Sequence, residues 1–390
     1  MLLNPAIKQL ALDLGFDLAG IAPIHVSNDL EFSRQWAKRG CNGEMKYLEN
    51  PRRFDPHLVL PSAKSVICVG LIYDTPFPYS TEVKPAPRAW ISRYAWGRDY
   101  HDLMRASLDR LRVALESLAP GTETRMFVDT GPLVERAFAR FSGIGWMGKN
   151  TCIINEKKGS WFFLGTILTS LELTPDAPAP DRCGSCTACL EACPTGALVE
   201  PHVMDASRCI SYFTIELKGS IPEQFRPKIA GNVYGCDICQ DVCPWNGGGH
   251  RPSSACGQHQ ITHPSITNIP QFYPVSVRPG RPAKEKGGQI KGPAIDRGQQ
   301  TMDATGFSLF NPPLDHLAMI SEDDFRRIFT HLAIKRPKYR GWLRNLSVAM
   351  GNSGSKGFLP WLEEAARHSD PAVREHAAWA IGRLQKKQEP

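Results

Sequence analysis

Hydrophobic residues recur with two different spacings over residues 1–180, which predicts a domain built from both helices and strands. Continuous or alternating apolar runs rich in β-branched and aromatic residues predict strands at 65–73, 124–128 and 161–169. Helical spacing occurs near the start, at Ile7, Leu10, Ala11 and Leu14, and again over 102–118 and 131–141. We therefore expect an α/β domain with a mixed or largely antiparallel sheet. It has no glycine-rich dinucleotide fingerprint after a strand.

Helical periodicity returns in the last part of the chain, after a stretch with little periodicity. The stretch 247–313 is rich in Gly, Pro, Gln and His and predicts a poorly ordered insertion or long loop. Beyond it we predict helices at 322–331, 340–350, 357–367 and 370–384. The last of these has the small-residue and aliphatic pattern of a HEAT-type helix, so we expect a short helical repeat docked on the body.

These patterns divide the 390 residues into four parts, and we classify the whole as α+β. The parts are a catalytic α/β domain (1–180), a small metal-dependent domain (181–246), the insertion (247–313) and a HEAT-like helical domain (314–390). No apolar run approaches the roughly 20 residues that span a bilayer. The first 22 residues are interrupted by Lys8, Asp13 and Asp17 and do not resemble a secretory signal, so we expect a cytoplasmic protein without membrane contact.

The net charge of +7 is concentrated at the C-terminal end. From residue 334 onward there are eleven Lys or Arg and five Asp or Glu, whereas the rest of the chain is close to neutral. A basic tail on a neutral body favours a polyanionic partner, although a solvated helix surface has the same composition.

Eight of the twelve cysteines form two groups with the spacing of iron–sulfur ligands. The first group is C-x2-C-x2-C-x3-C-P, and in the second an isolated cysteine precedes C-x2-C-x3-C-P. In such motifs the last cysteine of each group binds the other cluster. Cluster one is therefore predicted to use Cys183, Cys186, Cys189 and Cys243, and cluster two Cys193, Cys209, Cys236 and Cys239.

Zinc and disulfides are the alternatives for these cysteines. C-x2-C pairs also suit tetrahedral zinc, but the double arrangement is poor zinc spacing and lacks paired histidines. A chain that is not exported keeps its thiols reduced, which disfavours disulfides. The remaining cysteines are scattered and are interpreted as small buried hydrophobic residues: Cys41, Cys68, Cys152 and Cys256.

Three further segments have the composition of a functional site. Asp129 follows a predicted strand, where a carboxylate acts either as a general acid or as a helix-start residue that satisfies backbone N–H groups. The glycine-rich run 143–151 suits close approach to a flat or phosphate-bearing ligand, or is simply a hairpin. The run 91–101 mixes aromatics and arginines and suits a nucleotide or large cofactor, or is a solvated loop with an aromatic anchor.

Taken together, these motifs resemble the epoxyqueuosine reductase family of cobalamin- and iron–sulfur-dependent tRNA-modifying enzymes. The matching stretches follow one another along nearly the whole chain: SRYAWGRDYH, VDTGPLVER, GIGWMGKNT, CGSCTACLEACPTGAL, CISYFTIELKG, GCDICQDVCPWN and REHAAWAIGRL. The insertion after Asn246 departs from the family, whose members usually have a shorter link there.

The resemblance implies reduction of the epoxide of epoxyqueuosine at the wobble position of a tRNA anticodon, giving queuosine. It implies two [4Fe-4S] clusters, which carry single electrons, and a cobalamin whose cob(I) state attacks carbon. A low-potential flavodoxin or ferredoxin system would supply the electrons. Asp129 matches the proton donor of the family, and a protonated carboxyl there requires burial. By motif position we carry over the cobalamin contacts Arg52, Tyr94, Asn150, Ser211 and Lys218; the last two flank a segment, 210–218, that we expect to be a strand.

The basic tail then becomes the expected tRNA contact. Tyr339 and Trp342 lie among its cations and are suited to stacking on loop bases, while the cations suit stem phosphates. The cations are Lys335, Arg336, Lys338, Arg340 and Arg344.

Two rival functions share part of this pattern. A corrinoid reductive dehalogenase would also carry clusters and cobalamin, but such enzymes usually have a twin-arginine export signal, and this sequence shows none. A plain ferredoxin-type electron carrier would not need about 180 residues of α/β domain before its clusters.

Overall fold

The computed structural model describes residues 3–83, 87–247, 265–279 and 306–386. These residues form two compact units whose segments alternate along the chain. The first unit contains Met1–Asp74, Tyr100–Ser207 and Cys239–Ile266, and the second contains Thr75–Asp99, Arg208–Ile238 and Thr267–Pro390. In the described part of the chain, no helix has the length and apolar character needed to cross a membrane.

A four-stranded sheet forms the centre of the first unit. Its strands run antiparallel in the order β1 (Leu18–Pro23), β2 (Ser65–Ile72), β7 (Phe162–Thr169) and β4 (Thr124–Phe127). β2 pairs with β7 along its whole length, from Ser65 opposite Thr169 to Ile72 opposite Phe162. Every residue of β2 is buried, because it is a central strand with covered faces. The predicted antiparallel sheet and its three strands are confirmed.

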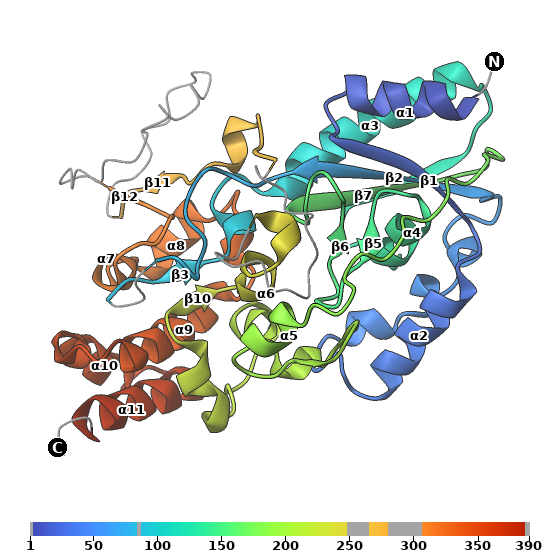
Figure 1. Cartoon of the computed structure of the whole chain (residues 1–390). Helices are drawn as coiled ribbons and strands as arrows, with labels where there is room; N and C mark the ends of the chain where they lie inside the picture. Colours follow the sequence, from blue (N-terminus) through green and yellow to red (C-terminus); the bar gives the residue numbers. More distant parts are fainter. Residues whose placement is uncertain (1–2, 84–86, 248–264, 280–305, 387–390) are drawn as a thin grey trace, which may run out of the picture. The chain divides into compact units, whose positions relative to one another are not determined.

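Helices cover both faces of this sheet (Figure 1). α1 (Leu3–Asp13) and α3 (Tyr100–Leu118) lie together on one face, and α4 (Glu135–Phe141) lies on the other. α3 packs through Met104, Leu108, Leu111 and Leu115, which repeat at helical spacing and are buried. Around this core the first unit also contains α2 (Ser27–Lys38), η1 (Lys46–Glu49), η2 (Pro51–Arg53), η3 (Pro56–Leu58), β5 (Trp146–Met147), β6 (Ile153–Ile154), α5 (Ala188–Ala192), β8 (Leu198–Glu200), β9 (Val203–Met204) and η8 (Pro244–Asn246).

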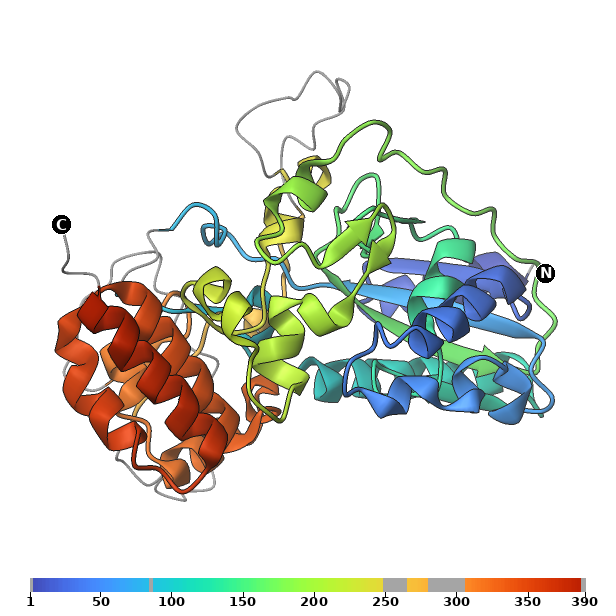
Figure 2. The ribbon, with the colours of Figure 1, turned by 90° about the horizontal axis from the view of Figure 1, so that it is seen from below.

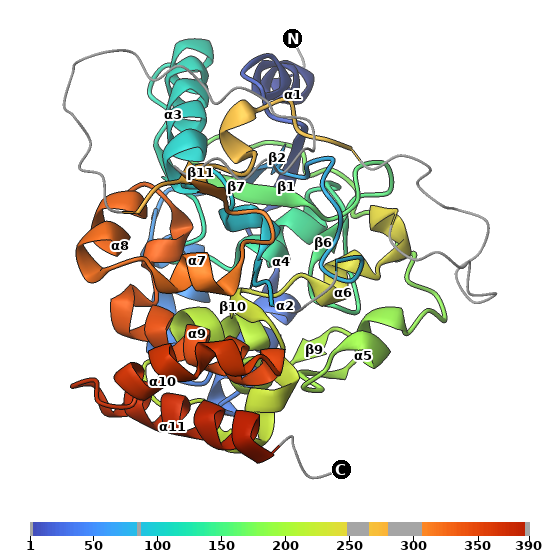
Figure 3. The same cartoon turned by 90° about the vertical axis from the view of Figure 1, so that its left-hand side faces the viewer.

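The second unit is organised around α9 (Lys338–Ser353). This helix packs against α10 (Leu359–Ala365) and α11 (Pro371–Lys386), and the three lie side by side in Figures 2 and 3. It also packs on β10 (Asn232–Tyr234), which pairs in parallel with β3 (Trp90–Ile91). The unit further contains η4 (Arg93–Ala95), η6 (Tyr212–Glu216), η7 (Glu223–Ile229), η9 (Pro270–Phe272), β11 (Ser276–Val277), β12 (Phe307–Ser308), α7 (Leu314–Ala318), α8 (Glu322–Ile328), η10 (Ala333–Lys335) and η11 (Lys356–Phe358); η5 (Ala206–Arg208) and α6 (Ile238–Asp241) lie where the two units exchange segments.

The structure corrects one predicted element outright. Residues 210–218, expected as a strand, contain a π-helical turn, Tyr212–Glu216. Its backbone carbonyls are bonded by side chains of α9: Asn345 Nδ2 donates to Thr214 O (2.8 Å), and Arg344 donates to Phe213 O. Because these acceptors are satisfied from a distant helix, the segment has no need of a strand partner, although its β-branched and aromatic composition predicted one.

Two other predictions change in extent. The helix expected over 131–141 begins only at Glu135, since the preceding residues form a loop held by side chains. In the expected insertion 247–313, residues 265–279 and 306–313 are described, and they contribute the β11–β12 pair and the buried Val277, Phe307 and Leu309. The prediction of poor order for 248–264 and 280–305 lies outside the described residues.

Candidate functional site

The four cysteines assigned to cluster one line a single small cavity in the first unit. Cys183 and Cys186 lie in the loop before α5, Cys189 lies within α5, and Cys243 comes directly before η8. Four thiols brought together from two distant stretches of sequence form a donor set suited to an iron–sulfur cluster. The residues present therefore fit the group that the spacing predicts.

Burial changes the chemistry of these thiols. It raises the pKa of the Cys189 thiol to about 11, and neighbouring thiols add to this effect. Burial also raises the pKa of Cys243, whose side chain is among the core residues. Thiols held protonated in this way become ligands when a metal displaces their protons, so loading releases protons.

The glycine-rich run 143–151 forms the β5–β6 hairpin beside this cavity, so the simpler of its two interpretations describes its structure. The hairpin also supports the cluster loop. Lys149 Nζ donates to the carbonyl oxygens of Gly184 (2.6 Å) and Cys186 (2.9 Å). A side chain at Gly145 would come within 2.2 Å of the Ile154 carbonyl oxygen, which explains why this position is glycine.

Asn150, expected to contact cobalamin, has a supporting role. Its side chain is 3 % exposed, its Oδ1 accepts the N–H of Cys152 (3.1 Å), and its Nδ2 donates to the carbonyl of Cys239 (3.1 Å). Both ends of the amide are thus bonded to backbone, and the residue ties the hairpin to the second cysteine stretch.

Of the cysteines assigned to cluster two, Cys193 and Cys239 belong to the first unit and Cys209 and Cys236 to the second. In the first unit Cys193 Sγ accepts the N–H of Ala197 (3.3 Å). In the second unit Cys209 and Cys236 are half-buried. Asp237, next to Cys236, is buried and accepts hydrogen bonds from Trp90 Nε1 (3.0 Å) and the N–H of Arg93 (2.8 Å). The start of the run 91–101 is therefore bound to the cysteine stretch of the second unit, and its Arg93 is buried instead of solvated.

Asp129 lies in a loop whose conformation is fixed from both sides. Its φ of +54° is in the left-handed region, and its N–H donates to both carboxyl oxygens of Glu135 (3.0 and 3.1 Å). Arg53 donates to the carbonyl of Gly131 (2.8 Å). α4 begins at Glu135, with Val134 as its N-cap, so Asp129 does not start the helix. The interpretation of Asp129 as a helix-start residue is therefore wrong.

A row of stacked aromatic rings ends at His101, which lies next to the Asp129 carboxyl. Tyr73, Phe163, Tyr100 and His101 follow one another with ring centroids 4.0 to 4.3 Å apart. His101 Nε2 lies 3.6 Å from Asp129 Oδ2. The Asp129 side chain is 57 % exposed, so the protein's own atoms do not provide the burial that the sequence analysis expected for a proton donor. The only sequence signal for Tyr100 and His101 was their position at the end of the aromatic run 91–101.

Glu135 is a site residue that the sequence analysis missed. Burial, followed by the nearby charge of Asp129, raises the pKa of this carboxyl to about 8, while the N–H of Asp129, Arg53 and Arg136 oppose the rise. A glutamate at the start of a helix is usually interpreted as a favourable partner of the helix dipole, which hides such a role.

The other expected cofactor contacts lie in different surroundings. Arg52 and Lys218 are exposed, and Ser211 precedes η6 and is half-buried. The Tyr94 hydroxyl bonds to that of Tyr234 (3.1 Å) in the second unit. Exposed cations such as Arg52 and Lys218 are chemically suited to the amide and phosphate groups at the edge of a cobalamin.

The basic tail contains an inner, buried group, Arg344 and Trp342, and an outer group of four cations. Arg344 is 1 % exposed and donates to the carbonyls of Leu217 and Gly219 (both 2.7 Å), and Trp342 is fully buried. Neither can reach RNA, so the expected contacts at Arg344 and Trp342 are wrong. The outer cations are paired or exposed: Lys335 with Asp99, Arg336 with Glu216, Arg340 with Asp370, and the exposed Lys338.

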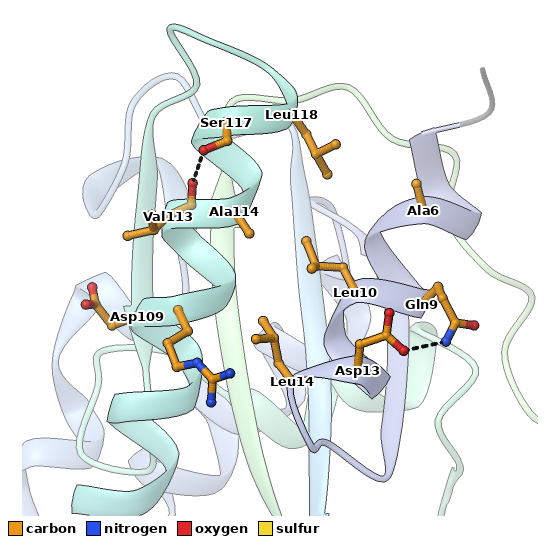
Figure 4. Close-up of a pocket in the computed structure, with 11 residues that line it drawn as sticks. Ala6, Gln9, Leu10, Asp13, Leu14, Asp109, Val113, Ala114, Ser117 and Leu118 are labelled. Carbon is orange, nitrogen blue, oxygen red and sulfur yellow. Dashed lines mark hydrogen bonds between the residues drawn. The ribbon is translucent and has the colours of Figure 1, made fainter.

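An open groove lies elsewhere in the first unit, between α1 and α3 (Figure 4). Its volume is about 810 Å³, and apolar side chains such as Leu10, Leu14, Val113 and Leu118 line much of it. None of the predicted site residues lines this groove.

Comparison with known proteins identifies what this arrangement is similar to. Residues 182–246 match the family model of a 4Fe-4S double cluster binding domain, and residues 53–130 match "Epoxyqueuosine reductase QueG, DUF1730". An epoxyqueuosine reductase of Salmonella typhimurium is 35% identical over 378 residues, 96% of this chain and 86% of that protein. One of Synechocystis is 40% identical over 323 residues, 82% of this chain and 95% of that protein.

Solved structures agree with the sequence comparison. An epoxyqueuosine reductase in complex with a modified tRNA-Tyr stem loop superposes with a TM-score of 0.78 at 31% identity, covering 98% of this chain and 90% of that one. The enzyme of Bacillus subtilis, with its catalytic aspartate loop swung out of the active site, gives 0.75 at 30% identity with the same coverage.

Proposed function

The chain belongs to the epoxyqueuosine reductase family, and from this premise we propose that it reduces epoxyqueuosine to queuosine at the wobble position of a tRNA anticodon. The observation that carries the proposal is the match of the family over nearly the whole chain, together with four clustered thiols and a carboxyl on a fixed loop. The net reaction takes up two electrons and two protons, converts the epoxide to a carbon–carbon double bond and releases the epoxide oxygen as water.

The proposal includes two [4Fe-4S] clusters with the ligand sets given above, and one cobalamin. Cobalamin, when bound, supplies a reducible cobalt that is a strong nucleophile toward carbon. Arg52 and Lys218 are suited to its polar edge, and Tyr94, Asn150 and Ser211 remain candidate contacts. A flavodoxin or ferredoxin system is proposed as the electron donor, in the cytoplasm.

The ligand exchange between the two motifs makes a specific prediction. Cys243→Ser should damage the same cluster as Cys186→Ser, because both thiols line one cavity. Electron paramagnetic resonance of the reduced variants distinguishes the clusters. If Cys243→Ser instead perturbs the signal lost in Cys239→Ser, the ligand sets are wrong.

Asp129 is the proposed proton donor to the departing oxygen. The Glu135 carboxyl and the Arg53–Gly131 bond hold its loop, and His101 lies beside its carboxyl. Asp129→Asn should still bind cobalamin and assemble clusters, yet lose turnover of epoxyqueuosine-tRNA on the order of 100-fold or more. An unchanged rate would remove Asp129 from this role.

The domain layout predicted from the sequence remains part of this proposal. It comprises a cobalamin-binding α/β domain (1–180), a two-cluster domain (181–246), the segment 247–313 and a HEAT-like domain (314–390). The helices α9, α10 and α11 support the last of these, because they pack against one another as consecutive helices.

The decisive assay is turnover of epoxyqueuosine-tRNA by anaerobically reconstituted protein. Formation of queuosine with cobalamin, and none without it, is the expected result. A corrin spectrum without turnover on this tRNA would favour the dehalogenase-type alternative.

A further inference from the structure

The β5–β6 hairpin fixes a positive charge within the cluster-one loop. The two carbonyls that accept from Lys149 Nζ belong to Gly184 and Cys186, so the ammonium group sits on the backbone of the first C-x2-C turn. An ammonium bonded to two carbonyls is held in place more firmly than one in solvent. The ligand turn therefore carries a fixed cation in addition to its cysteines.

Trp146 brings a second donor to the same cluster. Its side chain is 2 % exposed, and within the described part of the chain its indole N–H has no acceptor in ordinary hydrogen-bond geometry. The ring packs edge-on against Trp245 with centroids 5.0 Å apart, and both tryptophans pack with Cys183 and Cys243.

The Lys149 ammonium group and the Trp146 indole N–H both favour negative charge on the sulfur atoms of cluster one. A [4Fe-4S] cluster gains one negative charge when it accepts one electron, and donors to its sulfurs and nearby cations stabilise the reduced form. We propose that Lys149 and Trp146 raise the reduction potential of cluster one and so make its reduction by an external carrier more favourable than it would be without them. The proposal rests on the cluster-one ligand set given under the proposed function.

Four single variants separate charge, donor and packing. Lys149→Gln keeps a donor for the carbonyls but removes the charge, and Lys149→Arg keeps the charge. Trp146→Phe removes the N–H and retains an aromatic ring against Trp245. Lys157→Gln removes the same charge from an exposed position of the first unit and is the matched control.

The measurement is a redox titration of the full-length, anaerobically reconstituted protein, followed by electron paramagnetic resonance. The signal absent in Cys186→Ser identifies cluster one. Lys149→Gln should lower the reduced-to-oxidised ratio of cluster one about tenfold at a fixed potential, which is about 59 mV for a one-electron couple. Trp146→Phe should lower the ratio by a smaller factor, and Lys149→Arg and Lys157→Gln should leave it unchanged.

An unchanged cluster-one potential in both Lys149→Gln and Trp146→Phe would overturn the proposal. If Lys149→Gln fails to assemble the cluster, which iron and sulfide content would reveal, Trp146→Phe is the deciding variant. A lowered cluster-one potential in Trp146→Phe supports the proposal. An unchanged potential overturns it and leaves Lys149 with a structural role only. The titration needs neither tRNA nor turnover, so its outcome is independent of the test of Asp129.

Discussion

At the scale of single residues, Asp129 and Glu135 form one functional pair. The left-handed backbone at Asp129 is unusual for a residue other than glycine, and the Glu135 carboxyl compensates by accepting its N–H with both oxygens. The position of the proposed proton donor therefore depends on a carboxyl six residues later. We therefore propose that Glu135 is a positioning residue that acts through Asp129.

The protonation of Glu135 predicts a specific pH dependence of stability. Its pKa is about 8 in the folded protein, against 4.5 for an ordinary glutamate. Between these pH values the folded protein holds a proton that the unfolded chain releases, so this contribution is complete at low pH and is lost as pH rises toward 8. The free energy of unfolding should fall by up to about 1.4 kcal/mol per pH unit from this group.

Urea unfolding at several pH values between 5 and 8 measures this contribution. Glu135→Gln removes the titrating group, so the difference in unfolding free energy between wild type and variant should change across this range. Glu172→Gln is the control, because its side chain is 85 % exposed in the same unit and should leave the wild-type slope in place. A wild-type slope in Glu135→Gln would contradict the prediction.

At the scale of elements, the buried side of α9 carries a charged residue, Arg344. Arg344 donates to the carbonyls of Phe213, Leu217 and Gly219, which belong to the segment around η6. Asn345 bonds the same segment at Thr214 O (2.8 Å). The helix thus replaces the sheet partner that residues 210–218 lack, and it supports the stretch that follows Cys209.

Removal of the Arg344 side chain should therefore destabilise the protein strongly. Arg344→Met leaves buried carbonyls without donors, which should cost about 3 kcal/mol or more. Chemical unfolding monitored by circular dichroism measures the change. Lys338→Met, on the same helix but exposed, should stay within about 0.5 kcal/mol of wild type, and an equal effect of the two variants would refute the distinction.

At the scale of the whole molecule, the outer cations of the basic tail are the part of it that remains available to tRNA. Lys335 and Arg336 already pair with Asp99 and Glu216, so reversing their charge would also disturb the fold. Lys338 is exposed at the start of α9 and is the cleaner probe.

Lys338→Glu should weaken tRNA binding and reduce its salt dependence, because fewer counterions are released. The slope of log affinity against log salt concentration should become shallower by about 1 for each lost phosphate contact. Lys157→Glu, an equal charge change on an exposed residue of the first unit, should alter both quantities less. Filter binding at several salt concentrations makes the comparison. Identical affinity and slope in wild type and Lys338→Glu would exclude this part of the tail from RNA binding.

Features that depend on local spacing could be predicted from the sequence. β2 and β7 were predictable because short apolar runs that are rich in β-branched and aromatic residues favour buried strands. The first group of cysteines was predictable because its close spacing brings the thiols to one cavity. The position of Asp129 after a strand was likewise a local signal. These patterns repeat within a few residues and do not depend on distant parts of the chain.

The hydrogen bonds between side chains and backbone groups far away in the sequence could be seen only in the tertiary structure. Arg344 looked like one more surface cation, but α9 is covered by α7, α8, α10, α11 and β10, so its side chain is directed to the carbonyls near η6. Lys149 and Asn150 looked like parts of a ligand-binding loop, but they bond the cysteine stretches. Contacts between residues far apart in sequence decide which face of a helix or hairpin is covered and which buried carbonyl needs a donor. Local periodicity does not encode these contacts.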